Sequence, residues 1–154
     1  MRGRFGYHEP DIASSRWEDR VISDTTYELE PGRHAPGHAR RLVRAACTDW
    51  SADDVHTALV LTSELVTNAI LHTPGEVSIR VARHGVLLTV EVLDIGDGDV
   101  QQQPPSSAAE EGSVPMAESG RGLTLVEALA DRWGVRMNAY HNGKAVWFEL
   151  RPRG

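Results

Sequence analysis

The stretch Ser63–His72 reads SELVTNAILH, and the pattern around it decides the fold. Apolar side chains recur at intervals of three and four residues through this stretch and before it, which is the period of one helix face. The pattern begins after Asp53 and Asp54 and predicts one long helix that ends near His72. The apolar face of this helix comprises Val55, Ala58, Leu59, Thr62, Val66, Ala69 and Ile70.

Three polar residues lie beside that apolar face, namely Glu64, Asn68 and His72. They are spaced four residues apart, and each step of four advances only about 40° around a helix of 3.6 residues per turn. A carboxylate, an amide and an imidazole therefore align on one flank of the helix. Such a flank needs polar partners, and a bound ligand is one of the candidates.

Composition limits the classes of protein to which the chain can belong. Its 154 residues, 40% of them hydrophobic, suit one globular domain. No apolar run approaches the roughly 18 residues of a membrane span, and no signal-peptide pattern follows the basic N-terminus. Cys47 is the only cysteine, a usage that fits a reducing cytoplasm, where we expect the protein to reside. The formal net charge of −6 argues against nucleic acid as the main partner.

The N-terminal third is less regular than the central helix. Residues 1–24 show no sustained period, which predicts a flexible extension ahead of a single domain over residues 25–154. Thr25–Leu29 predicts a short first strand, and Ala39–Trp50 predicts a helix with a flank of arginines. This flank is interpreted either as a solvated face or as a docking surface for an acidic partner.

Two alternating segments follow the central helix. Glu76–Arg83 and Val86–Asp94 each alternate apolar and polar residues and predict strands joined by a tight turn. Asp94 falls in phase with the apolar residues of its strand, so its carboxylate should point toward the covered side of the sheet. Such an acid costs several kcal/mol unless it is paired or hydrogen-bonded. The simpler interpretation is an aspartate that caps the following turn.

The glycine-rich acidic segment 94–99 fits none of three common phosphate or metal loops. It lacks the glutamate of a calcium loop, the third glycine of a dinucleotide fingerprint and the features of a Walker motif. Residues 99–119 are of low complexity and predict a lid or a disordered segment. Gly120–Asp131 then predicts a helix whose initial glycines would let backbone N–H groups approach a phosphate, or would act only as hinges.

The C-terminal segments Trp133–Tyr140 and Lys144–Arg151 predict a hairpin, with Asn142-Gly143 as its turn signal. Strands joined by hairpins, with helices packed on one face, predict an α/β (α+β) two-layer sandwich. Its sheet is expected to be mixed and mainly antiparallel.

Three short motifs in series now give a specific resemblance. Glu64-x-x-x-Asn68, then Asp94-x-Gly96-x-Gly98, then Gly120-x-Gly122-Leu123 resemble the N, G1 and G2 boxes of the GHKL (Bergerat-fold) ATPases and kinases. Within that superfamily, the chain resembles the small bacterial anti-sigma-factor serine/threonine kinases. The phrases SELVTNA at 63–69, GRGLTLV at 120–126 and GKAVWF at 143–148 carry this narrower likeness.

The resemblance implies roles for the residues of the boxes. Asn68 would hold the Mg²⁺ that bridges the ATP phosphates, and Glu64 would be the catalytic base for a serine hydroxyl. Asp94 would accept a hydrogen bond from the adenine amino group. The glycines of the second box, Gly96 and Gly98, would leave room for the base and the hinge of the ATP lid at 99–119. The residues that would wrap the phosphates are Gly120, Arg121, Gly122 and Leu123.

The resemblance also implies partners. A cytoplasmic kinase of this kind would bind a sigma factor, phosphorylate an anti-anti-sigma (STAS-type) protein and tend to form homodimers, with no direct contact to nucleic acid or membrane. Two departures favour the alternative of a catalytically weak ATP-binding interaction module. The lid offers no lysine to the phosphates, and Ala145 stands where relatives often carry a hydroxyl residue near adenine. A third interpretation, the catalytic domain of a histidine kinase, is weakened because the length leaves no room for a phosphoacceptor domain.

Overall fold

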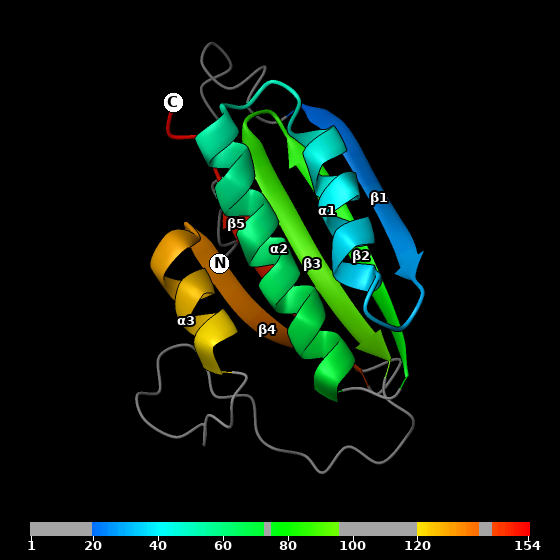
Figure 1. The fold of residues 1–154 in the computed structure, drawn as a ribbon. Coiled ribbons are helices and arrows are strands. Elements are labelled where there is room, and N and C mark those ends of the chain that lie inside the picture. The colour runs from blue at the N-terminus through cyan, green and yellow to red at the C-terminus, as the bar shows by residue number, and fades with distance from the viewer. Residues whose placement is uncertain (1–19, 73–74, 96–119, 139–142) are drawn as a thin grey trace, which may run out of the picture.

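Within the described residues, three helices pack against a five-stranded sheet. Figure 1 shows the helices on one face of the sheet. The computed structural model describes residues 20–72, 75–95, 120–138 and 143–154. The predicted two-layer sandwich is therefore confirmed. In chain order the elements are β1 (Val21–Leu29), α1 (Ala35–Ala46), α2 (Ala52–His72), β2 (Glu76–His84), β3 (Leu87–Ile95), α3 (Gly120–Leu129), β4 (Arg132–Asn138) and β5 (Gly143–Leu150).

The sheet has the strand order β1-β2-β3-β5-β4. All four ladders between the described strands are antiparallel, so the expectation of a mixed sheet was wrong. After β3 the chain forms α3 and then β4, and β5 returns to lie between β3 and β4. Because β5 runs antiparallel to both of its neighbours, the long crossover creates no parallel pair.

Two boundaries in the N-terminal third differ from the predicted ones. β1 begins at Val21, and its register with β2 starts at His84, so the expected end of the extension after Asp24 falls inside a strand. α1 runs from Ala35 to Ala46 rather than from residue 39 to residue 50. Its proline lies in the first turn, where a helix does not need the missing N–H group.

The side chain of Ser51 caps the start of the central helix α2. The Ser51 hydroxyl accepts a hydrogen bond from the Asp54 backbone N–H at 3.1 Å and donates to the Asp54 carboxylate at 2.7 Å. The same carboxylate accepts the backbone N–H groups of Arg153 at 2.9 Å and Gly154 at 3.3 Å. These hydrogen bonds, of which the one from the Arg153 N–H has the largest effect, hold the pKa of Asp54 below its usual value.

α2 buries a wider face than its apolar stripe predicted. Leu61 and Leu65 lie outside that stripe, and both are fully buried. They belong to the same core as the inward residues of the sheet, such as Ile79, Val90 and Phe148. α2 packs against α1 on one side and α3 on the other, and for this reason only a narrow strip of the helix remains for polar side chains.

A buried arginine joins the end of α1 to the hairpin of β2 and β3. The Arg83 side chain is 2% exposed and donates to the carbonyls of Gly85 at 2.8 Å and Ala46 at 2.7 Å. It also forms a bidentate pair with Asp49 at 3.0 and 2.9 Å. Its guanidinium lies 5.1 Å from the centre of the Trp50 ring. Each of these contacts of the Arg83 guanidinium is therefore with a hydrogen-bond acceptor or with the face of an aromatic ring.

The helix-free face of the sheet carries a ladder of charges. Arg80 donates two hydrogen bonds to the Asp24 carboxylate, at 2.8 and 2.6 Å. The buried Glu91 carboxylate accepts hydrogen bonds from Arg80 at 3.4 Å and from Arg136 at 2.7 Å. Arg136 also lies over the ring of Trp147 at 5.8 Å. Two arginines thus compensate the negative charge of Glu91. This explains how an acid on the face of the sheet away from the helices can be only 7% exposed.

Candidate functional site

The polar flank of α2 supplies the first two candidate residues. Glu64 and Asn68 are half-buried, whereas His72, one turn further on, is exposed. Ser63, next to Glu64, accepts a hydrogen bond from Arg40 of α1 at 2.9 Å. This bond joins the two helices at the turn that carries Glu64. Glu64 and Asn68 therefore both remain candidate site residues, whereas the exposed His72 differs from them in burial.

Asp94 is the second part of the site. It lies near the end of β3 and is 7% exposed, on the same side of the sheet as Val90 and Val92. The inward aim predicted from its phase is confirmed. Its Oδ1 accepts the backbone N–H of Lys144 at 3.3 Å, and its Oδ2 lies 4.0 Å from the Lys144 Nζ.

A row of paired residues surrounds Asp94 on the sheet. Lys144 on β5 is the Cα partner of Asp94 on one side and of Met137 on the other. All three lie on the helix-facing side, because cross-strand partners share a face of the sheet and Asp94 is in phase with the core residues Val90 and Val92. Met137 is 49% exposed, and Val135, two residues before it on β4, is 36% exposed. The end of the sheet therefore combines a buried acid, a lysine and accessible apolar side chains.

Ala145 does not belong to this row. It pairs with Leu93 on β3 and Arg136 on β4, so it lies on the opposite face from Asp94. Its interpretation as a position near adenine was wrong, because successive residues of a strand point to opposite faces. Lys144 is the residue of this strand that lies beside Asp94.

The third part is the start of α3. The helix begins at Gly120, and Arg121 and Gly122 form its first turn. Leu123 packs as a half-buried residue against the core. Gly96 and Gly98 lie outside the described residues, as does the whole predicted lid at 99–119. In Figure 1 the start of α3, the end of α2 and the end of β3 all lie at one end of the sandwich. The fold therefore gathers the described parts of the three boxes.

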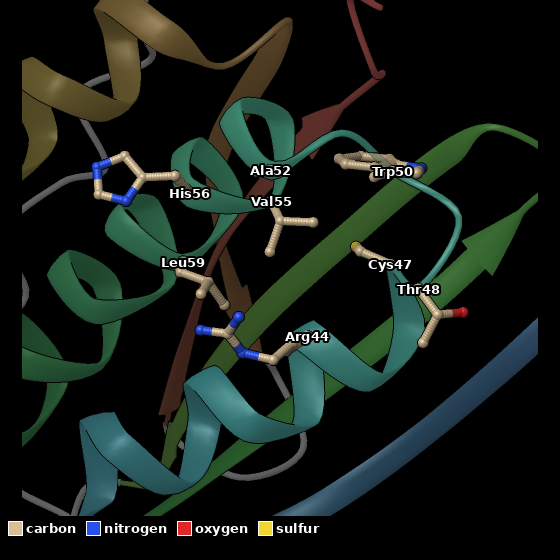
Figure 2. A pocket seen from close by; sticks show the side chains of 8 residues that line it. All are labelled: Arg44, Cys47, Thr48, Trp50, Ala52, Val55, His56 and Leu59. Carbon is tan, nitrogen blue, oxygen red and sulfur yellow. The ribbon is translucent and has the colours of Figure 1, made fainter.

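The two helices α1 and α2 and the loop between them also line an open pocket of about 380 Å³, shown in Figure 2. It lies between the last turn of α1 and the first turns of α2, and Leu59 and Val55 form part of its wall. Asn68 lies more than two turns further along α2, so this pocket is distinct from the three boxes. Cys47 lines it, and burial raises the pKa of the Cys47 thiol to about 11. Sequence reasoning gave no signal for this pocket.

A family model described as a histidine kinase-like ATPase domain matches residues 29–150. The chain belongs to this family. The match confirms the GHKL resemblance and the ATPase-like fold expected from the three boxes. A comparison with curated proteins finds none that matches the chain. None of the helices described in this histidine kinase-like ATPase domain is long and apolar enough to cross a membrane.

The residues of this ATPase domain fit ATP and Mg²⁺, the ligands that its family implies. Asp94 presents a buried carboxylate that can accept an amino group, and the first turn of α3 presents backbone N–H groups to an anion. Within residues 20–72, 75–95, 120–138 and 143–154, no group of three metal-binding side chains occurs. Mg²⁺ in nucleotide sites is commonly held by one or two protein oxygens together with phosphates and water. Asn68 is the amide oxygen available for this role.

Proposed function

We propose that this chain is an ATP- and Mg²⁺-dependent protein serine/threonine kinase that binds a sigma factor and phosphorylates an anti-anti-sigma partner of the STAS type. The observation that carries the kinase half is the pair Glu64 and Asn68. They lie one turn apart on one flank of α2, and both are half-buried. A carboxylate is thus held beside the amide assigned to the metal.

Bound ATP would supply the phosphoryl group, and the protein would supply position and charge. Phosphoryl transfer needs little covalent chemistry from the enzyme, since orientation and charge neutralisation dominate. Asn68 would ligate Mg²⁺, and the first turn of α3 would face the phosphates. Asp94 would accept the adenine amino group, and Glu64 would accept the proton of the substrate serine hydroxyl.

Arg40 supports the position assigned to Glu64. Its bond to Ser63 spans two helices and fixes the turn of α2 from which Glu64 projects. A base that must meet a hydroxyl of another protein benefits from such a rigid support. The partner half of the proposal rests on the likeness of residues 63–69 and 120–126 to anti-sigma-factor kinases.

The first experiment is calorimetric titration with ATP, with and without Mg²⁺, for the wild type and for Asn68→Ala. The expected result is Mg²⁺-dependent binding that weakens at least tenfold in the variant, which corresponds to about 1.4 kcal/mol. An unchanged affinity in Asn68→Ala would remove Asn68 from the site. Absence of binding at millimolar ATP would refute the kinase proposal.

The second experiment tests phosphotransfer. The chain is incubated with radiolabelled ATP and a panel of STAS-domain proteins from the same organism. Glu64→Ala should keep ATP binding and lose transfer, whereas Glu28→Ala, at an exposed position on β1, should keep both. Label that survives acid indicates phosphoserine or phosphothreonine, whereas acid-labile label would indicate histidine kinase chemistry. ATP binding without transfer to any panel member would favour the interaction module.

A further inference from the structure

The single lysine of the chain lies at the centre of the candidate site. Lys144 is the only lysine among the 154 residues, and the register of β5 places it directly beside Asp94. Its backbone N–H already occupies Oδ1 of that carboxylate, at 3.3 Å. Its ammonium lies 4.0 Å from Oδ2, and its side chain is 44% exposed. The ammonium is therefore near the acid and retains access to solvent.

Together, the two side chains present an acceptor next to a donor. Oδ2 of Asp94 can accept a hydrogen bond, and the Lys144 ammonium carries three donors and no acceptor. An adenine presents the complement, because its amino group is a donor flanked by ring nitrogens that accept. Met137 and Val135 lie exposed on the same face of the neighbouring strand and offer apolar area for a flat ring.

We propose that Lys144 is a base-recognition residue, whose ammonium donates a hydrogen bond to a purine ring nitrogen next to the amino group accepted by Asp94. This inference rests on the nucleotide site of the proposed function. A different role for Lys144 makes the opposite prediction. If it served only as the counter-ion of Asp94, an incoming base would displace it, and removal of its charge would strengthen binding.

The experiment measures the affinities of ATP, 1-deaza-ATP and 7-deaza-ATP for the wild type, Lys144→Met and Lys144→Arg. The three nucleotides carry the same triphosphate, so general attraction of the lysine charge to phosphate cancels in the comparison. In the wild type, one of the two deaza analogues should bind about tenfold more weakly than ATP, the size expected for one charge-assisted hydrogen bond. In Lys144→Met that ratio should fall to about twofold or less, and Lys144→Arg should keep it.

Several outcomes would overturn this role. They are equal binding of all three nucleotides to the wild type, a ratio that persists in Lys144→Met, and tighter ATP binding by Lys144→Met. Failure of the wild type to bind any of the three would instead refute the nucleotide site itself. Far-UV circular dichroism of each variant shows whether the fold is retained, and the Arg variant supplies a second measurement if Lys144→Met does not fold.

The single lysine also permits a test that needs no substitution. Acetylation of Lys144 by an amine-reactive ester, followed by mass spectrometry, reports the accessibility of the ammonium. Saturating ATP should slow the modification several-fold, whereas tripolyphosphate, which lacks a base, should not. Equal rates with and without ATP would contradict contact between Lys144 and the base.

Discussion

Replacing Arg83 by methionine removes a guanidinium that is 2% exposed and leaves a side chain of similar length. The carbonyls of Gly85 and Ala46 lose their charged donor, and Gly85 is itself buried. A buried acceptor left without a partner costs about 1–3 kcal/mol, and the half-buried Ala46 carbonyl can partly recover its bond from water. The pair with Asp49 adds little, because the Asp49 side chain is 66% exposed. We therefore expect a loss of about 2–4 kcal/mol in the free energy of unfolding.

Urea unfolding followed by circular dichroism measures this loss, and thermal unfolding should show a midpoint lowered by roughly 5–15 °C for a domain of this size. Arg80→Met is the matched control. Like Arg83, Arg80 forms salt bridges, here with Asp24 and Glu91, but its side chain is 35% exposed. When Arg80 is replaced, Arg136 still compensates Glu91. The control should lose no more than about 1 kcal/mol. Equal losses in the two variants would refute the argument that the buried carbonyl bonds of Arg83 join α1 to the hairpin.

Three further predictions concern other parts of the fold. A Cβ on Gly134 would meet the Trp147 ring at 2.9 Å, so Gly134→Val should lower the free energy of unfolding by about 1–3 kcal/mol. Gly37→Ala, whose Cβ meets nothing closer than 3.6 Å in a helix, should raise it by about 0.5–1 kcal/mol, and urea titration of both variants checks the contrast. Because its hydrogen bonds lower the pKa of Asp54 in the folded state, the carboxylate stabilises the protein above its unfolded pKa of about 4 and loses this effect as the pH falls through the folded value. The urea midpoint of Asp54→Asn should therefore lie below that of the wild type at pH 7 and approach it as the pH falls below the unfolded pKa and through the folded one, and a pH-independent difference would contradict the assignment. Cys47, 1% exposed with a pKa raised to about 11, should resist iodoacetamide at pH 8 until urea unfolds the chain, as mass spectrometry can show.

The parts of the fold that local pattern determines could be predicted from the sequence. The period of the central helix and the alternation of β2 and β3 indicated their elements within one or two residues. The same alternation predicted that Asp94 points inward, and the structure places it so. α1 was placed four residues too late, because the helical pattern was taken to begin only at Ala39, after Pro36-Gly37. Inside a first turn, the proline of this dipeptide costs the helix little.

The parts that depend on strand order could not be predicted in this way. Alternation shows which residues share a face of one strand, but not which strand lies beside it. The position of β5 next to β3 brings Lys144 to Asp94, whereas the alternation within β5 alone already places Ala145 on the opposite face. Glu91 is a similar case, because its burial depends on arginines from β2 and β4 that only the assembled sheet brings together.

The position of β5 has a consequence for synthesis on the ribosome. β3 and β5 are neighbours in the sheet, yet 50 residues separate Asp94 from Lys144. At about 5–20 residues per second, the edge of β3 stays open for roughly 3–10 seconds while α3 and β4 are made. An open edge is a template for pairing with another chain, so this interval is when the nascent protein is most exposed to aggregation. Insertion of β5 closes the edge and in the same step brings Lys144 to Asp94, so protection of the sheet and completion of the proposed base site coincide.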